Sequence, residues 1–579
     1  MRLQRLCMFT LLALIGAAGP APAQSDETLE RLAEKYWDAL MERFPTRATA
    51  IGDYRFNDRL DDAGEAGRKR WKATLQTLLW NVRKVPGRGL SADDRLTRDL
   101  LERSILDELL RIECHLEYIP LEPLYGSHLQ LPLLLVSQPL RDVADFKAYA
   151  ARLRAFSKQV TDIISNMRTG VRLKLVSPCV TIEKVIPQIR MHIVSDVTQS
   201  EFYALVRRAT ALSDADRKAV VGEITDAIAS DVIPAYLQLL AFVEDEYLPL
   251  CRSTVGLGSL SGGDKVYEAL VRLETTVRMP PEEIHALGLS EVARIGGEMA
   301  KVKEEVGFEG TPGEFLAHMR TDPRYRFTSG EELLAAADAI LQRTRPLMPK
   351  LFGRLPKADC VMKEIEAFRA ASSPVAYYNP PPEDGSRPGY YYINTYAPHE
   401  RLRFTLEALT YHETIPGHHL QMTLDQENTA LPKFRRYGRF TAYVEGWALY
   451  AEKLGYEIGG YRDPYARFGQ LTFEMSRACR LVVDTGMHCK GWSRQQAIDY
   501  MAATTSLALL DIEAEIDRYI VWPGQALAYK IGELSILRLR KEAEEQLGEK
   551  FDLRAFHDAL LSGGAMPIDV LEKRMRERM

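Results

Sequence analysis

The chain lacks the compositional signs of nucleic-acid-binding, fibrous and low-complexity proteins. Its formal net charge is −5 at pH 7, from 75 basic and 80 acidic residues, and the mild acidity is spread along the chain. This distribution argues against a nucleic-acid partner. We find no internal repeat and no low-complexity linker. Hydrophobic residues make up 46% of the sequence, so the chain can bury a large core.

Long hydrophobic runs are also missing after the N-terminal segment. No later stretch reaches 18 uninterrupted apolar residues, so we expect no membrane span in the mature protein. The N-terminal segment has the order of a secretory signal: Arg2 and Arg5, an apolar stretch over residues 6–18, and Ala21-Pro22-Ala23. We expect cleavage after Ala23 and a periplasmic or secreted protein. Cys7 lies at the start of the apolar stretch rather than after it, so we do not expect it to be a lipid-attachment cysteine.

Cysteine is scarce, and no C-x-x-C motif occurs among the seven cysteines. We see no signature of a cysteine nucleophile. Six cysteines remain after cleavage, and they allow 15 disulfide connectivities. Scattered buried thiols are an equally good interpretation. The six are Cys114, Cys179, Cys251, Cys360, Cys479 and Cys489.

Most of the chain is predicted to be helical because its apolar residues recur with the 3.6-residue period. Clear examples span residues 25–44, 91–114, 145–167, 213–246, 281–306 and 330–348, with a stop expected at Gly170. The middle differs, since residues 357–368 and 375–396 mix aromatic and β-branched residues with prolines and glycines. We therefore expect a mainly α fold with a small β-sheet near residues 357–396, in which 390–396 is the best strand. We divide the chain into a helical N-terminal lobe, 24–350, and a catalytic lobe, 351–579.

The most informative segment runs from His412 and Glu413 to His418 and His419 and contains three of the 11 histidines. Imidazole and carboxylate groups suit a catalytic zinc, and three protein ligands leave one position open for water. A glutamate directly after the first histidine can act as general base on that water. The segment therefore predicts a metal-dependent hydrolase with Glu413 as the base.

The spacing departs from H-E-x-x-H, in which the two histidines stand at i and i+4 on one helix face. Here Pro416 occupies i+4, and His418 and His419 follow at i+6 and i+7. In a regular helix the i+7 residue lies about 10.5 Å along the axis, too far to share one ion. Because Pro416 removes a backbone donor and Gly417 permits unusual dihedrals, we expect a break that returns His418 to His412. His419 remains the alternative second ligand.

Glu445 is the expected third ligand. It follows His418 by 27 residues, in a helical stretch of apolar and aromatic neighbours. A carboxylate buried there needs a partner, and a metal ion would serve. Glu452 lies seven residues further on, on the same helix face.

Four segments together resemble the bacterial family called DUF885, a domain of unknown function. They are His412 to Gln421, Glu445 to Glu452, Arg480 to His488, and Pro523 to Gly532. The resemblance covers nearly all of the mature chain as one domain. The family is grouped with the zincin-like (gluzincin) peptidases. This implies a helical ellipsoid with a deep cleft, similar to carboxypeptidase Taq and angiotensin-converting enzyme. It also implies one zinc ion per chain on His412, His418 and Glu445.

Peptide hydrolysis also needs a donor for the oxyanion of the tetrahedral intermediate. The candidates are His488, Tyr519 and Tyr529, because the related peptidases place a late tyrosine, and often a histidine, over the metal. His488 lies between Gly486 and Gly491, which favours a loop. Packing is the alternative role for either tyrosine.

Three further residues are candidates for substrate binding. Arg480 and Lys530 could bind a substrate carboxylate, and a structural ion pair is the alternative for each. Tyr392 belongs to the predicted strand 390–396, which could form a cleft edge and pair with an extended peptide.

The sequence therefore favours an exported zinc-dependent peptidase that acts on short peptides, and a carboxypeptidase-like action is one form of this hypothesis. Two alternatives remain open: a metal-dependent amidase or esterase with a non-peptide substrate, and a non-catalytic peptide-binding protein of the same fold. Metal content distinguishes the last from the other two, and peptide cleavage distinguishes the first two. The oligomeric state is not predicted.

Overall fold

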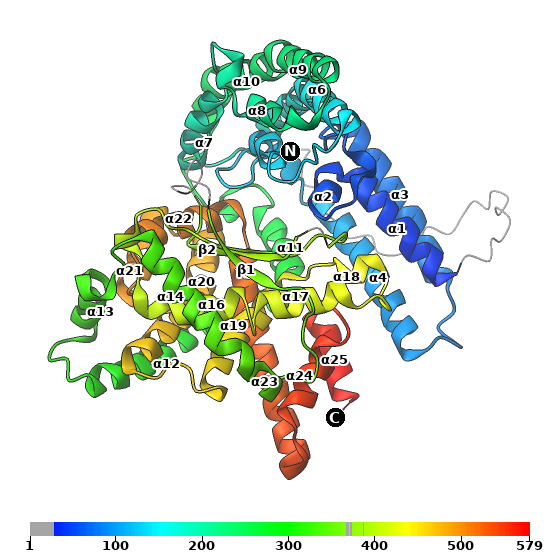
Figure 1. Ribbon diagram of the computed structural model, residues 1–579. Helices are drawn as coiled ribbons and strands as arrows, with labels where there is room; N and C mark the ends of the chain where they lie inside the picture. Colours follow the sequence, from blue (N-terminus) through cyan, green and yellow to red (C-terminus); the bar gives the residue numbers. More distant parts are fainter. Residues whose placement is uncertain (1–27, 366–369, 371–372, 386, 579) are drawn as a thin grey trace, which may run out of the picture.

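The computed structural model describes residues 28–365, 370, 373–385 and 387–578. The predicted signal segment and its cleavage after Ala23 lie outside this part of the chain. Helices build nearly all of the molecule, and one small sheet lies near its centre, so the expected mainly α fold is confirmed (Figure 1). Helices α6, α9 and α10 form the upper part of this view, and α23 to α25 lie at the bottom.

Every helix predicted before the sheet is present, with small shifts at its ends. Helix α6 passes Gly170 and ends at Leu173, and the next residue, Lys174, adopts the left-handed conformation. The helices before the sheet are α1 (Leu29–Arg43), α2 (Pro45–Ala50), α3 (Glu65–Lys84), α4 (Ala92–Glu113), α5 (Gln130–Leu134), α6 (Val143–Leu173), α7 (Cys179–Met191), α8 (Glu201–Ala204), α9 (Asp214–Ala227), α10 (Ile233–Ala241), α11 (Gly263–Thr275), α12 (Pro281–Glu305), α13 (Pro312–Thr321) and α14 (Gly330–Thr344).

The helices after the sheet carry the predicted site residues. They are α16 (Leu406–Glu413), α17 (His418–Glu427), α18 (Lys433–Arg436), α19 (Thr441–Glu457), α20 (Pro464–Lys490), α21 (Arg494–Thr504), α22 (Leu509–Val521), α23 (Ala528–Leu547), α24 (Leu553–Leu561) and α25 (Ile568–Arg576).

The sheet has the strand order β1-β3-β2, with β1 at Cys360–Glu364, β2 at Ala376–Asn379 and β3 at Gly389–Ile393. Strand β3 pairs in parallel with β1 and antiparallel with β2. The prediction that this strand forms an edge was wrong, because β3 is central and its backbone is paired on both sides. Tyr392 is buried and stacks on Tyr377 with ring centroids 4.8 Å apart. Its strand therefore cannot pair with a peptide, and only β1 and β2 present edges.

The hydrophobic cores do not divide at residue 350. The largest core joins α1, α3 and α4 to the helices after the sheet, and it includes both Trp37 and Trp447. A separate core is built between Leu121 and Tyr247, chiefly by α6, α7, α9 and α10. The N-terminal helices thus share a core with the C-terminal half of the chain, while residues 121–247 form their own.

The second core contains an unusual helical run, Asp214–Leu250. By length and composition alone this run could cross a membrane, although we expected no such segment. Many of its apolar side chains, including Ile228 and Tyr236, are buried in the second core, whereas Leu237 and Leu250 are exposed. Two π-helical turns interrupt it, at Ile228–Val232 and Phe242–Tyr247. Pro234 and Pro249 follow these turns, where a proline excludes the ordinary helical hydrogen bond.

One disulfide joins Cys179 at the start of α7 to Cys251. Cys114, Cys360, Cys479 and Cys489 are free thiols in the described chain. The disulfide closes a long stretch of chain, because its cysteines lie 72 residues apart in sequence.

Helices α19 and α23 approach each other closely at two glycines. A Cβ atom on Gly446 would lie 2.5 Å from the Gly532 backbone, and one on Gly532 would lie 1.8 Å from the carbonyl oxygen of Ala442. No side chain fits at either position, so the two helix backbones are in contact here.

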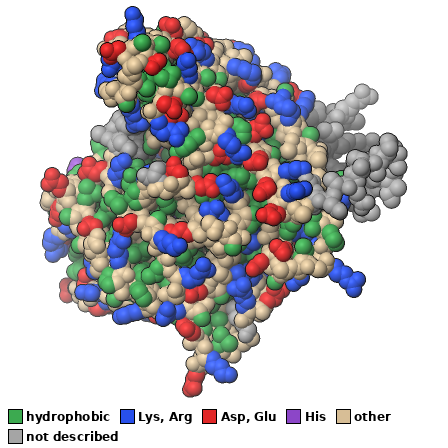
Figure 2. All heavy atoms as spheres, turned by 45° about the vertical axis from the view of Figure 1, so that its right-hand side comes forward, with side chains coloured by type: hydrophobic (Ala, Val, Ile, Leu, Met, Phe, Trp, Pro, Cys, Tyr) green, Lys and Arg blue, Asp and Glu red, His purple; other side chains and the backbone are tan. Residues whose placement is uncertain are grey.

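On the surface, acidic and basic side chains are interspersed over the face that Figure 2 shows.

Candidate metal centre

The helix break predicted at Pro416-Gly417 is present. Helix α16 ends at Glu413 and α17 begins at His418, with a cis peptide bond before Pro416. Gly417 packs so closely against the preceding turn that a Cβ atom there would lie 2.0 Å from the His412 carbonyl oxygen. Only glycine fits in this position, and the tight turn brings His418 beside His412.

His412, His418 and Glu445 each offer a ligand atom, and these atoms all lie within 4.8 Å of one another. The Nε2 atom of His412 is 3.6 Å from Glu445 Oε2, and that of His418 is 3.4 Å from the same oxygen. The two imidazole rings are nearly perpendicular, with centroids 4.7 Å apart. Two nitrogens and one oxygen converging on a point match the donor set of a catalytic zinc.

A second carboxylate orients His412 from behind. His412 Nδ1 lies 2.8 Å from Glu452 Oε1, and Glu452 is fully buried. Arg477 lies 3.5 Å from the same oxygen. This hydrogen bond places the proton on Nδ1 and leaves Nε2 as a donor atom for a metal, the arrangement usual for metal-ligating histidines. Glu452 was expected on the same helix face as Glu445, but no role was predicted for it. Arg477 gave no sequence signal at all.

The charges of this cluster suit a cation. Burial lowers the pKa of His412, but the carboxylates of Glu445 and Glu452 outweigh it and raise this pKa to about 9. Burial raises the pKa of Glu445, yet the positive charge of the two histidines holds it well below its usual value. Glu445 Oε2 and His418 Nδ1 are buried and lack a hydrogen-bond partner in the described chain. The donor set therefore fits a metal ion.

Glu413, the expected base, is the last residue of α16 and is 7% exposed. It lies next to the central strand of the sheet. Burial is the main cause that raises the pKa of Tyr391, and the negative charge of Glu413 raises it further. The charge of Glu413 thus acts both on the metal ligand His412 and on Tyr391 of the sheet.

His419 faces away from the cluster. Its Nδ1 lies 2.8 Å from the hydroxyl of Tyr378 on β2, and burial lowers its pKa to about 4. It lines a small cavity of about 150 Å³ together with Ile415 and Cys360. The structure therefore brings His418, and not His419, to His412 and Glu445.

Tyr529 is the only proposed oxyanion donor that the described structure places beside the cluster. Its ring lies nearly parallel to that of His412, with centroids 6.5 Å apart. Burial and the charge of Glu445 raise its pKa, so its hydroxyl keeps its proton at neutral pH. The phenol therefore remains a hydrogen-bond donor.

Tyr519 and Arg480 are bound to each other and to Glu515. The Tyr519 hydroxyl donates to Glu515 at 2.6 Å and accepts from Arg480 Nε at 2.8 Å. Arg480 Nη2 donates to Glu515 at 2.8 Å. The Tyr519 hydroxyl is thus fully engaged in hydrogen bonds within the protein. Arg480 forms a structural ion pair with Glu515, which was the alternative to a role in substrate binding. Glu515 was missed because it lies far from Arg480 in sequence.

Lys530 is not available to a substrate, and its predicted binding role was wrong. Its side chain is fully buried, and its Nζ lies 2.7 Å from Glu533, 2.8 Å from Glu474 and 3.1 Å from Glu291. An ammonium group in a core requires such partners. Lys530 therefore holds α12, α20 and α23 together.

His488 is a core residue, and the predicted loop around it was wrong. It lies inside α20, where its Nδ1 accepts from the Leu257 backbone N–H at 3.1 Å. Its Nε2 donates to the Tyr519 carbonyl oxygen at 3.0 Å. Burial lowers its pKa to about 4. Both ring nitrogens are occupied, so His488 cannot donate to an oxyanion.

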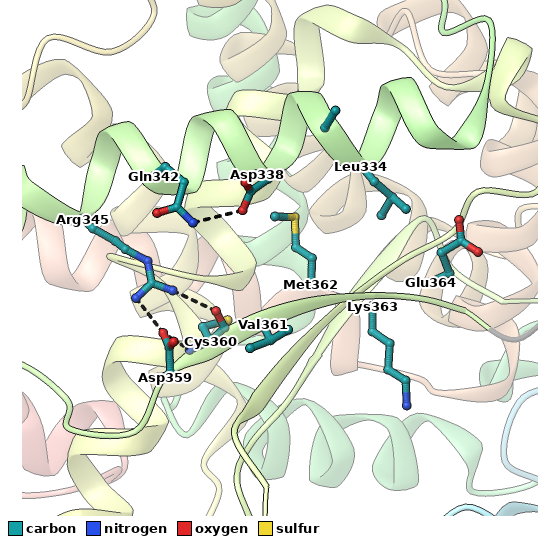
Figure 3. Close-up of a pocket in the computed structure, with 11 residues that line it drawn as sticks. Leu334, Asp338, Gln342, Arg345, Asp359, Cys360, Val361, Met362, Lys363 and Glu364 are labelled. Atoms are coloured by element: carbon teal, nitrogen blue, oxygen red, sulfur yellow. Dashed lines mark hydrogen bonds and ion pairs between the residues drawn. The ribbon is translucent and has the colours of Figure 1, made fainter.

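A larger cavity than the one beside His419 lies elsewhere, between α14 and the outer edge of β1 (Figure 3). Its volume is about 610 Å³, and none of the residues discussed above as site candidates lines it. Its polar groups pair with one another, as Arg345 does with Asp359 at 2.6 Å and with the Cys360 carbonyl oxygen at 2.8 Å. It offers no comparable set of converging ligands.

Two solved structures resemble the chain along almost its whole length. A candidate lipoprotein from Colwellia psychrerythraea has a TM-score of 0.90 and 29% sequence identity, with 95% of this chain and 99% of that chain covered. A candidate lipoprotein of unknown function from Shewanella oneidensis has a TM-score of 0.76 and 19% identity, with 95% and 100% covered. The second likeness concerns the fold alone.

The comparison with curated proteins gives no match. The family model described as "Bacterial protein of unknown function (DUF885)" matches residues 45–575, which include every residue of the cluster. The chain therefore belongs to the DUF885 family.

Proposed function

We propose that this protein is an exported, zinc-dependent peptidase of the zincin-like type that hydrolyses short peptides. The observation that carries the proposal is the convergence of His412, His418 and Glu445, with Glu452 orienting His412. Three protein ligands leave a coordination position open, as in catalytic rather than structural zinc sites. A site built only to bind peptides would not need a buried glutamate beside its ligands.

The residues divide the chemistry as follows. Zinc on these ligands would supply Lewis-acid activation of water and of the scissile carbonyl. Glu413 would take the proton of the attacking water and pass it to the leaving amine. The hydroxyl of Tyr529 would donate a hydrogen bond to the oxygen that becomes negatively charged. Neither His488 nor Tyr519 is included, because their polar atoms are engaged.

Export is supported by three observations. The N-terminal sequence has the order of a secretory signal, and both solved relatives are described as candidate lipoproteins. The Cys179–Cys251 disulfide also suits an oxidising compartment. A preference for a C-terminal carboxylate is not part of the proposal, because the two cations expected to bind it are engaged in ion pairs.

The central test is Glu413→Gln. This variant should bind zinc and fold normally, but its kcat should fall by about 10²–10⁴-fold, the usual contribution of a general base. Glu457→Gln, on the exposed end of α19, is the matched control and should leave kcat unchanged. His412→Ala should lose zinc, measured by elemental analysis of protein purified without chelators.

The outcomes separate the alternatives. Zinc binding with cleavage of a peptide library supports the proposal. Zinc binding with hydrolysis only of non-peptide amides or esters favours the second hypothesis. Absence of bound metal with intact peptide binding favours a non-catalytic protein. Near-normal turnover by Glu413→Gln on the best substrate would show that the assigned base is wrong.

A further inference from the structure

The guanidinium of Arg480 lies against the ring of Tyr529. Its Cζ is 4.3 Å from the ring centroid, well within the range of a cation–π contact. Tyr529 in turn lies next to His412. Arg480 therefore touches the residue beside the metal ligands, although it belongs to a different helix, α20 rather than α23.

The other side of Arg480 is fixed by hydrogen bonds. Nε binds the Tyr519 hydroxyl and Nη2 binds Glu515, both at 2.8 Å. Arg518 binds the same carboxylate, with its Nη2 also at 2.8 Å from Glu515. Glu515 thus receives two guanidinium groups and one hydroxyl. This arrangement leaves Arg480 little freedom to rotate.

The remaining nitrogen of Arg480, Nη1, is buried and has no hydrogen-bond partner among the described residues. A buried charged donor without an acceptor is costly, and the ring face of Tyr529 is the electron-rich group that the guanidinium meets. Because the atom is shielded from solvent, a substrate carboxylate cannot reach it in this conformation. The contact between the guanidinium and the Tyr529 ring is therefore the interaction that connects Arg480 to the ligand cluster.

The charges reinforce this interpretation. Two arginines share the single carboxylate of Glu515, and the charge of Arg480 opposes that of Glu445 at Tyr529. A cation close to a phenol makes its hydroxyl a stronger hydrogen-bond donor, because it stabilises negative charge on the oxygen. With Arg480 in place, the Tyr529 hydroxyl therefore suits the developing oxyanion better than it would without this arginine.

We propose that Arg480 is the positioning residue of Tyr529. Held by Glu515 and Tyr519, it fixes the ring beside the ligand cluster and strengthens the hydroxyl as a donor in the transition state. This inference rests on the proposed peptidase function. It differs from a purely structural role, in which Arg480 would only join α20 to α22 and its loss would affect stability alone.

The experiment compares Arg480→Lys, Arg480→Met, Tyr529→Phe and the double variant Tyr529→Phe/Arg480→Met, all loaded with zinc, on the best peptide substrate. Tyr529→Phe should lower kcat about 10²-fold, as expected for an oxyanion donor. Arg480→Met should lower kcat at least tenfold with little change in KM, and Arg480→Lys should lie between it and the wild type. The double variant should be no slower than Tyr529→Phe, because Arg480 acts through Tyr529.

Arg494→Lys is the matched control, since Arg494 is also ion-paired to a residue of α22, Asp517, at 2.6 Å. It should retain normal kcat. Equal losses from Arg480→Met in the wild-type and Tyr529→Phe backgrounds would overturn the inference, as would an Arg480→Met enzyme with normal kcat.

A crystal structure of Arg480→Met gives a second readout that does not depend on activity. We expect the Tyr529 ring to leave its parallel position beside His412. An unchanged ring would refute the positioning role even if the protein proved not to be a peptidase. Lack of hydrolysis by the wild type would instead refute the proposed function, so the two failures are distinguishable.

Discussion

The second core and the region around the metal ligands differ in how many ionisable side chains they bury. Between Leu121 and Tyr247 the core is chiefly aliphatic and aromatic, it buries few ionisable groups, among them Arg152 and His128, and it is flanked by one disulfide. Around α19, α20 and α23 the interior contains many more ionisable groups. The buried ones include Glu413, Glu452, Glu474, Arg477, Arg480, Asp484, His488, Lys530 and Glu533.

The difference shows where the chain accepts the cost of buried charge. Apolar burial stabilises without demanding exact partners, whereas each buried charge requires a partner in a defined geometry. The second core can therefore serve as scaffold. The charged interior fixes the orientation of side chains, which a catalytic centre needs.

The largest effect should follow from breaking the charged interior at Lys530. Lys530→Met leaves Glu533 without its closest partner and should lower the free energy of unfolding by about 3–5 kcal/mol. The measurement is chemical denaturation. Lys541→Met, at an exposed position of the same helix, should change it by less than about 0.5 kcal/mol. Recovery of part of the loss in Lys530→Met/Glu533→Gln would confirm the cause, and a small loss in Lys530→Met would contradict it.

The corresponding change in the second core is removal of the disulfide. The variant Cys179→Ser/Cys251→Ser should lose about 2–4 kcal/mol, since the bridge closes a loop whose ends are 72 residues apart. We expect the loss in the thermal transition while hydrolysis at low temperature stays normal. A fall in kcat that exceeds the fraction unfolded would mean that the second core contributes more than scaffold.

A smaller effect is expected from Glu452→Gln, which weakens the carboxylate behind His412 without removing a ligand. Zinc affinity should fall about 10–100-fold, the usual effect of losing such a partner. Competition against a chelator of known affinity measures this. Glu457→Gln on the same helix should bind zinc as the wild type does. Equal affinity in the two variants would show that Glu452 serves only the packing of α19.

An effect that is small over any one pH unit concerns Asp425 on α17. Burial raises the pKa of its carboxyl to about 8, although hydrogen bonds from Gln421 and Ala565 oppose this. The folded state therefore holds a proton that the unfolded state releases near pH 4. Its contribution to stability is complete below pH 4 and falls by up to about 1.4 kcal/mol per pH unit between pH 4 and 8. Asp425→Asn should remove this slope in denaturation curves recorded at several pH values, and an unchanged slope would exclude Asp425 as its source.

The sequence predicted what local patterns determine. Helices followed from the 3.6-residue period, and the break between His412 and His418 followed from Pro416 and Gly417 alone. The prediction of Glu445 succeeded at the level of proximity because its helix is apolar on most sides. These features depend on neighbours within a few turns.

Features that depend on distant partners could not be predicted. A small sheet was predicted, but nothing local shows that Gly389–Ile393 is its central strand, paired on both sides. Gly486 and Gly491 suggested a loop around His488, yet Gly486 lies inside a helix where a Cβ atom would lie 2.7 Å from Trp492. The partners of Lys530 come partly from α12 and α20, which no spacing rule connects. The Cys179–Cys251 pair was one choice among many.

The contact between Gly446 and Gly532 has a consequence for the site as a whole. Gly446 follows Glu445 directly, and Gly532 lies three residues after Tyr529, within one helical turn. The close contact of the two helix backbones at these glycines therefore sets the distance between Glu445, a metal ligand, and Tyr529, the proposed oxyanion donor. Alanine at both positions would keep every functional side chain of the site, but it would push α19 and α23 apart and so increase the distance between Glu445 and Tyr529.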